Sequence, residues 1–218
     1  MKNVIERTVE FVQKHLADEK SGHDWQHVQR VWKTAVYLQS KEGGNLEVIE
    51  LAALLHTAAE RDYKNPPDEK IRPLALSGIF DVLEIAEDLK PLIISIIQAS
   101  KFHGAESKIP MTLEAKIVQD ANWLDSLGAI GIARNFTAGG YIGRKIFNPR
   151  VKLGSGLSRK KLQKKKKESS SIAYFYEKAF VIPSLLSTNT AKHIAAKRVD
   201  FIKQFVAQFM QEWDMLDL

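Results

Sequence analysis

The stretch LEVIELAALLHTAAER, residues 46–61, predicts a helix in which a run of small and apolar residues leads to one histidine, His56. The following segment, KNPPDEK, ends this helix, because paired prolines cannot continue one. The residue after the histidine is Thr57. An aspartate at this position would make two adjacent metal ligands, so the threonine raises the question of whether metal chemistry is retained.

Helical periodicity continues on both sides of this stretch. Residues 2–17 carry Ile5, Val9, Val12 and Leu16 at three- and four-residue spacing, which is typical of one apolar helix face. The capping residues SGHD, at 21–24, predict the start of the next helix, and KEGGN predicts its end.

Further helices are predicted at about 73–87, 90–100, 111–127, 170–181 and 190–213. No segment shows sustained period-two alternation, so we expect an all-α fold. At 218 residues the chain is long enough for one sizeable domain, and we expect a single-domain helical bundle over residues 1–218.

The composition excludes several classes of protein. The chain has no cysteine, which excludes disulfides, thiolate zinc sites and thiol catalysis. The N-terminal segment carries charges throughout and lacks the apolar core of a signal peptide. No stretch approaches the roughly 18 apolar residues of a membrane span. We therefore expect a soluble, cytoplasmic protein without a membrane partner.

The positive charge is concentrated in one segment. Between Arg144 and Lys167 there are eleven Lys or Arg residues and no acid, so the rest of the chain has a net charge of −5. The pattern changes at residue 128, where a glycine-rich stretch begins, and we interpret about 144–168 as a basic, solvated loop insertion. The helices after it have apolar faces that must pack on the same core, so no domain boundary is expected here.

The basic loop leaves two roles open besides that of a solvated excursion. It could bind nucleic acid through phosphates, but it has no interleaved aromatic residues for base stacking, and we do not expect a nucleic-acid partner. Alternatively Arg144, Lys145 or Arg150, near the glycine-rich turn, could steer an anionic substrate.

Histidines and carboxylates occur on several predicted helices. His23 and His27 are four residues apart and share a face if both lie within the helix; Asp120 lies on another helix. Each residue alone is more often a hydrogen-bonded core or surface side chain. Converging from separate helices, however, such residues build the metal sites of helical bundles.

Five segments occur in a characteristic order: GHDWQHVQRV, ELAALLH, KIVQDANWLDSLGAIGIAR, FYEKAF and QEWD. This arrangement resembles the HD-domain superfamily of metal-dependent phosphohydrolases, in particular a compact bacterial subgroup, over residues 20–214. The resemblance implies an all-helical fold and a divalent cation held by histidines and aspartates. It further implies that an activated water attacks a phosphoester or pyrophosphate bond, commonly in a nucleotide.

Carried over to this chain, the resemblance implies that His27, His56 and Asp120 are metal ligands and places Asp24 at an acidic position near the pocket. Neutral imidazole and carboxylate together suit manganese, iron, zinc or magnesium. Glu60 could substitute for a missing carboxylate, since it lies one helical turn after His56, although pairing with Lys64 or Arg61 explains it as well.

The chain also departs from the family pattern. Thr57 replaces the aspartate of the HD pair, and DANWLD, at 120–125, replaces an acid with Asn122 and an arginine with Trp123. Ala99 and Tyr174 stand where histidines are usual. The apolar framework is kept while polar groups are lost, which is typical of a preserved fold with an altered pocket.

Three functional classes follow. The first is a divalent-metal phosphohydrolase acting on a nucleotide or other small phosphorylated molecule, with Arg144 and Lys145 as candidate substrate contacts. The second is a catalytically impaired relative that binds a nucleotide or a protein partner without turnover. The third, with the weakest support, is a nucleic-acid-binding protein. The enzyme stands first because three candidate ligands survive together.

Overall fold

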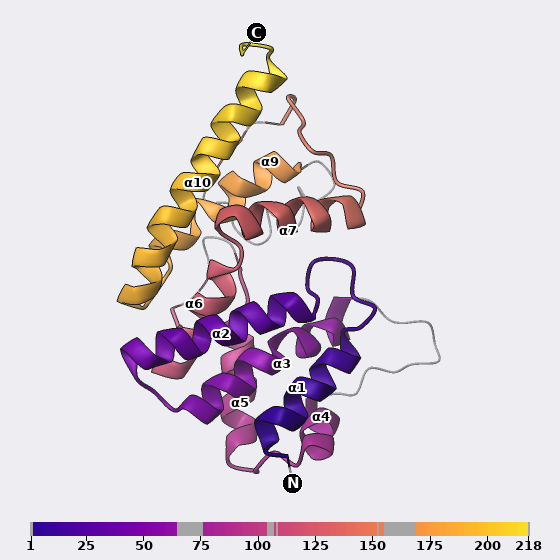
Figure 1. The fold of residues 1–218 in the computed structure, drawn as a ribbon, viewed down its shortest axis with the longest axis vertical. Helices are drawn as coiled ribbons and strands as arrows, with labels where there is room; N and C mark the ends of the chain where they lie inside the picture. The colour runs from indigo at the N-terminus through magenta and orange to yellow at the C-terminus, as the bar shows by residue number, and fades with distance from the viewer. Residues whose placement is uncertain are drawn as a thin grey trace. The chain divides into compact units, whose positions relative to one another are not determined.

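The computed structural model describes residues 2–64, 76–103, 107, 109–151, 153–154 and 169–217, with side chains up to residue 58 in the first of these ranges. The chain divides into two compact units, and each is described by itself (Figure 1). Unit 1 comprises Met1–Lys101 and Pro110–Asn122, and unit 2 comprises Phe102–Ile109 and Trp123–Leu218.

The described residues are predominantly helical and include no named strand; an isolated bridge joins Lys145 to Ser170. The prediction of an all-α fold is therefore confirmed. No helix in the described ranges is long and apolar enough to span a membrane.

Unit 1 is built around one central helix. Helix α3 packs against α1, α2 and α5. The helices that lie in this unit, or begin in it, are α1 (Val4–His15), α2 (Trp25–Glu42), α3 (Leu46–Lys64), α4 (Leu76–Leu83), α5 (Leu89–Ala99) and α6 (Leu113–Leu124).

Helix α3 is buried around its whole circumference over residues 51–58, which include His56 and Thr57. A helix that is apolar on every side belongs in a core, because no face of it gains from contact with water. This burial explains the alanine-rich composition of the stretch: small side chains let three helices approach α3 closely. Its two polar residues are carried into the interior as a consequence.

The ends of α2 are fixed by the residues that the sequence indicated. Asp24 caps its N-terminus, where one carboxylate oxygen accepts a hydrogen bond of 2.9 Å from the backbone N–H of His27. The helix ends at Gly43, whose φ of +87° lies in the left-handed region that glycine adopts without strain. His27 therefore occupies the first turn of α2.

Unit 2 is organised by the long helix α10, which packs against α7 and η2. Its elements are α7 (Gly128–Tyr141), α9 (Ser171–Tyr174), a π-helical turn η1 (Phe175–Ala179), a 3-10 turn η2 (Ile182–Ser184) and α10 (Asn189–Trp213). Phe136 of α7, Phe175 of η1 and Phe205 of α10 meet in one aromatic cluster, with ring centroids 5.9–6.2 Å apart.

Helix α7 is not among the predicted helices, because glycines are frequent in it and favour irregular structure. The structure gives these glycines another role. A Cβ at Gly131 would lie 2.3 Å from the backbone carbonyl of Ser126, and one at Gly139 would lie 2.4 Å from Ser171 Oγ. Gly131 is required for close packing against this backbone, and Gly139 lets the side chain of Ser171 approach the helix. Residues 155–168, most of the expected basic loop, lie outside the described residues.

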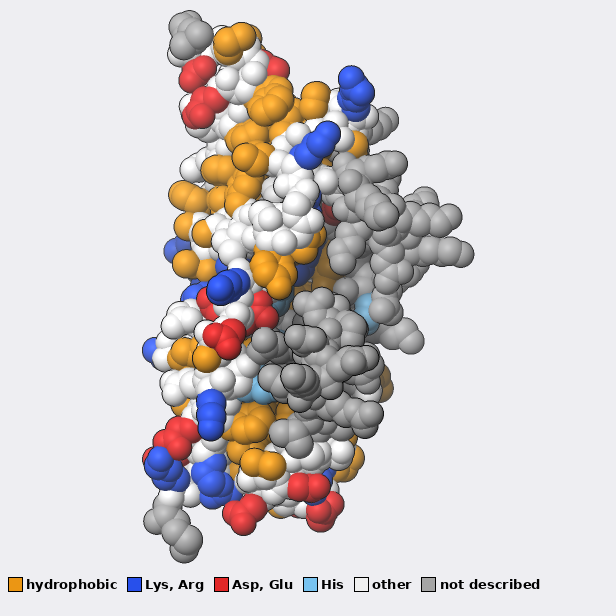
Figure 2. Space-filling model, turned by 90° about the vertical axis from the view of Figure 1, so that its right-hand side faces the viewer, with side chains coloured by type: hydrophobic (Ala, Val, Ile, Leu, Met, Phe, Trp, Pro, Cys, Tyr) orange, Lys and Arg blue, Asp and Glu red, His pale blue; other side chains and the backbone are white. Residues whose placement is uncertain are grey.

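The C-terminal part of α10 carries exposed hydrophobic side chains, and hydrophobic groups are visible on this part of the surface (Figure 2). Trp213 is 48% exposed. Its ring nevertheless contacts Phe147 and stacks on Phe209, with centroid distances of 5.0 and 6.0 Å. These contacts attach the segment after α7 to the end of α10.

We expect Gly131→Ala to destabilise the protein by about 1–3 kcal/mol, because the new methyl group meets a backbone carbonyl that cannot rotate away. The matched control is Gly140→Ala in the same helix, where a Cβ meets nothing within 4 Å. This control should change stability by less than about 1 kcal/mol, in the stabilising direction. Urea unfolding of both variants measures the difference; equal midpoints would contradict the packing role of Gly131.

Candidate functional site

His56 is held in a defined orientation inside unit 1. Its Nδ1 lies 2.7 Å from the carbonyl oxygen of Ala53, one turn earlier on α3. A carbonyl can only accept, so Nδ1 carries the proton, and in the neutral ring Nε2 is an acceptor with a lone pair. A histidine ligand is commonly oriented by donating its other ring nitrogen to a carbonyl in this way.

His27 brings a second imidazole to the same point. Its Nε2 lies 3.1 Å from Nε2 of His56, and both side chains are buried. The backbone N–H of His27 is held by Asp24, the cap of α2. The two residues come from helices that are adjacent in the packing of unit 1, so the fold sets the distance between their rings.

The side chain at position 57 reaches this point as well. The Thr57 hydroxyl lies 3.0 Å from Nε2 of His56 and is buried. Because the His56 nitrogen has only a lone pair in the neutral ring, the hydroxyl is placed to donate to it. A neutral hydrogen-bond donor therefore occupies the position where the resemblance implies a carboxylate.

The two histidines fit a shared metal ion. Two nitrogens each about 2.0–2.1 Å from one ion lie roughly 3 Å apart when they take neighbouring coordination positions. The observed 3.1 Å between the Nε2 atoms is such a separation. Within the described ranges, no group of three His, Asp or Glu side chains is arranged to hold a metal. The structure thus brings together two of the three predicted ligands.

Asp120 is fully buried on α6 and belongs to unit 1, like the two histidines. Aspartate is seldom buried unless it is paired, hydrogen-bonded or coordinated to a metal, so this burial is compatible with a ligand role. Its part as the third ligand stays a prediction.

Two further carboxylates, Asp24 and Glu60, are candidate catalytic groups, and the structure describes them to different extents. Asp24 is partly exposed and serves as the helix cap described above, through one of its carboxylate oxygens. Glu60 lies on α3, but its side chain is outside the described residues.

A third histidine lies next to the pair. His23 precedes α2, so it does not share a helix with His27, yet their rings meet edge to face with centroids 5.6 Å apart. Its Nδ1 lies 3.1 Å from Ser21 Oγ. The four-residue spacing predicted this proximity only if both histidines lay on one helix. In the structure, the segment that precedes α2 brings His23 to His27.

Two of the positions that depart from the family pattern have structural roles. Trp123 is 1% exposed and packs edge to face on Phe102 within unit 2, at 5.6 Å between centroids. A cation at this position would have to be buried. Ala99 ends α5, and its carbonyl accepts a hydrogen bond of 2.7 Å from Gln119. Trp123 thus serves packing, and Ala99 lies at the end of a helix.

The two predicted substrate contacts lie in unit 2 and have unlike surroundings. Lys145 is exposed, and its carbonyl accepts a hydrogen bond from the N–H of Ser171. Arg144 is half-buried, with its guanidinium 5.4 Å from the ring centroid of Tyr174.

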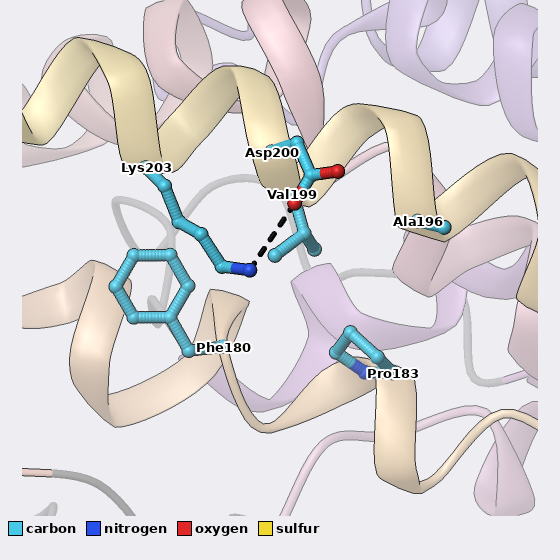
Figure 3. Close-up of a pocket in the computed structure, with 6 residues that line it drawn as sticks. All are labelled: Phe180, Pro183, Ala196, Val199, Asp200 and Lys203. Carbon is cyan, nitrogen blue, oxygen red and sulfur yellow. Dashed lines mark hydrogen bonds and ion pairs between the residues drawn. The ribbon is translucent and has the colours of Figure 1, made fainter.

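A depression in unit 2 offers no catalytic group. It lies between α10 and the segment that contains η2 (Figure 3). Its charged residues, Lys203 and Asp200, pair with each other at 3.1 Å and so neutralise each other. The remaining lining residues are Phe180, Pro183, Ala196 and Val199. The histidine pair of unit 1 is therefore the stronger candidate site.

A model of the HD-domain family matches residues 24–127, a range that contains His27, His56 and Asp120. The uncharacterised protein YpgQ of Bacillus subtilis is 34% identical over 212 residues, which cover 95% of this chain and 92% of YpgQ. The chain belongs to the HD-domain family.

Solved structures extend the similarity to nearly the whole chain. A Lactobacillus plantarum protein is 32% identical with a TM-score of 0.82, and 97% of each chain is covered. YpgQ in complex with ADP is 29% identical with a TM-score of 0.73, covering 95% of this chain and 97% of YpgQ. A Bacillus thuringiensis HD-superfamily hydrolase is 37% identical with a TM-score of 0.68, and 96% of each chain is covered. The fold is that of the HD-superfamily hydrolases.

We expect nitrogen-15 NMR of histidine-labelled protein near pH 8 to show His56 protonated at Nδ1 and unprotonated at Nε2, because Ala53 O accepts from Nδ1. Thr57→Val keeps the shape of the side chain but removes the donor, so it should shift the Nε2 resonance while Nδ1 stays protonated. The resonance of exposed His193 serves as the control. Protonation of His56 at Nε2 alone would contradict the orientation described here.

Proposed function

We propose that this protein is a divalent-metal phosphohydrolase of the HD type that acts on a nucleotide or another small phosphorylated molecule. The observation that carries the proposal is the pair of imidazoles whose Nε2 atoms face each other at 3.1 Å, with the opposite nitrogen of His56 fixed by Ala53. The complex of YpgQ with ADP supports a nucleotide as the ligand class.

In this proposal His27, His56 and Asp120 hold the ion, which would be manganese, iron, zinc or magnesium. A bound divalent ion lowers the pKa of its water and so supplies a nucleophile near neutral pH. Asp24 caps α2 through one carboxylate oxygen, and its carboxylate is the first candidate for accepting a proton. Glu60 is the second candidate. The cations Arg144 and Lys145 would attract the anionic substrate.

A second function is favoured by Thr57. Its hydroxyl, 3.0 Å from Nε2 of His56, brings no negative charge to offset a dication. In this alternative the protein binds a nucleotide or a protein partner without turnover. Burial of Trp123 supports it, because an arginine is replaced there by a side chain that reaches no substrate from the interior.

Activity assays separate the two functions. We expect chelator-treated protein supplied with manganese to hydrolyse at least one member of a panel of nucleoside di- and triphosphates. His27→Asn should reduce the rate at least about 100-fold, because it removes a proposed metal ligand, whereas Lys197→Gln, at an exposed position of α10, should not. Circular dichroism confirms folding of each variant. No turnover by the unaltered chain would overturn the enzyme proposal and leave the non-catalytic one.

We expect Thr57→Asp to bind manganese at least about tenfold more tightly than the unaltered protein, because a carboxylate brings a charge to the position of the hydroxyl. Thr57→Asn is the matched control, since it has nearly the shape of aspartate without the charge. Calorimetric titration with manganese measures all three proteins. Equal affinities for the aspartate and asparagine variants would show that residue 57 does not contribute a ligand.

A further inference from the structure

Two cations flank one tyrosine in unit 2. The guanidinium carbon of Arg144 is 5.4 Å from the ring centroid of Tyr174, and Nζ of Lys178 is 5.6 Å from the same centroid. The Lys178 ammonium also lies 5.3 Å from the ring of Phe102. Both cations thus lie at the distance where ammonium and guanidinium groups interact with aromatic rings.

No carboxylate in the described ranges pairs with either cation within 4.0 Å. The side chain of Arg144 donates to the amide oxygen of Asn135 at 3.3 Å, and its Nε is buried without a hydrogen-bond partner among the described residues. Glu177, beside Lys178 in sequence, is buried and accepts instead from the hydroxyl of Ser169, at 3.1–3.2 Å. A buried donor left unbonded is costly, which indicates that a further acceptor belongs here.

The electrostatics of Tyr174 report the same excess of positive charge. Burial alone would raise the pKa of this phenol. The charges of Lys178, Arg134 and Arg144, together with a hydrogen bond from Lys178, outweigh this effect, so the pKa lies below its ordinary value. Arg134 is paired with Asp125 at 3.1 Å. The uncompensated part of the field therefore comes from Arg144 and Lys178.

The local backbone holds this cluster in place. The N–H of Arg144 donates to the carbonyl of Gly139 at 2.7 Å. The buried Asn135, which accepts from Arg144, also donates to the carbonyl of Ser171 at 2.7 Å, and so ties α7 to α9. Tyr174 immediately precedes the π-helical turn η1, and Lys178 lies within that turn. Such turns are frequent at functional sites. The cations are thus positioned before any ligand arrives.

We propose that Arg144, Lys178 and Tyr174 form an anion site in unit 2 that binds the phosphate group of a small molecule. Arginine offers a planar set of donors that matches phosphate oxygens, lysine adds a point charge, and the phenol adds a hydroxyl donor. The site uses residues of unit 2 alone and needs no metal. It includes Arg144 of the proposed substrate contacts but assigns the second cation to Lys178 and not to Lys145.

The test uses the full-length protein treated with a chelator, with inorganic phosphate and ADP as separate probes. Calorimetry should show binding of at least one probe without metal. Arg144→Gln and Lys178→Gln should each weaken binding at least about tenfold, because each removes a charge-assisted hydrogen bond. Arg144→Lys should recover only part of the affinity, since it restores the charge without the planar donors.

A spectroscopic readout reports binding at Tyr174 itself. Ultraviolet titration of the phenolate band, assigned by its loss in Tyr174→Phe, gives the pKa of Tyr174. Phosphate should raise this pKa, because the anion opposes the cations that lower it. An overall charge effect is excluded by Lys197→Gln, which removes one exposed cation of α10 and should leave both the affinity and the pKa unchanged.

Three results would overturn the site: no binding of either probe without metal, equal loss of affinity in Lys197→Gln, or full affinity in both Arg144→Gln and Lys178→Gln. Equal affinity for phosphate and ADP would support a site for the phosphate group alone, and tighter binding of ADP a site that takes it as part of a nucleotide. His27→Asn should retain phosphate binding, so failure of the metal site and failure of this site are distinguishable.

Discussion

Burial of α3 on every side is the constraint on which the candidate site depends. Because α1, α2 and α5 pack on this helix, its residues 51–58 are buried, and the polar ones must find partners inside the protein. His56 meets this requirement at one nitrogen through Ala53 O. Its other nitrogen is left to face His27 and Thr57. The packing of the helices thus directs the lone pair of His56 Nε2 toward the side chains of His27 and Thr57.

That lone pair explains why Thr57 is more than a missing charge. A nitrogen whose lone pair accepts a hydrogen bond from a hydroxyl cannot at the same time bind a metal ion, so the Thr57 hydroxyl, 3.0 Å away, would compete with an ion for Nε2 of His56. A carboxylate at the same place has no proton to donate near neutral pH and adds a ligand. If His56 is a metal ligand as proposed, threonine at position 57 would oppose metal binding in two ways, through competition for Nε2 and through the absence of a negative charge.

The sequence predicted most helices, because apolar periodicity is a local feature that survives packing. The convergence of His27 with His56 was implied by the family resemblance and not by periodicity. The sequence did not predict α7, since glycine favours irregular structure locally and only the carbonyl of Ser126 shows why Gly131 is required. The surroundings of Tyr174 were likewise beyond sequence reasoning. They depend on a π-helical turn and on the direction that Glu177 takes toward Ser169, neither of which follows from residue spacing.

The two candidate sites are suited to different tasks. The histidines of unit 1 are suited to holding a metal, whereas Arg144 and Lys178 of unit 2 carry permanent positive charge that needs no cofactor. Changes at position 57 act on the lone pair of His56 and leave the cations unaltered. A chain of this kind can lose metal affinity while it retains phosphate recognition. The unusual threonine and the intact cation cluster are therefore compatible in one protein, whether it hydrolyses its ligand or only binds it.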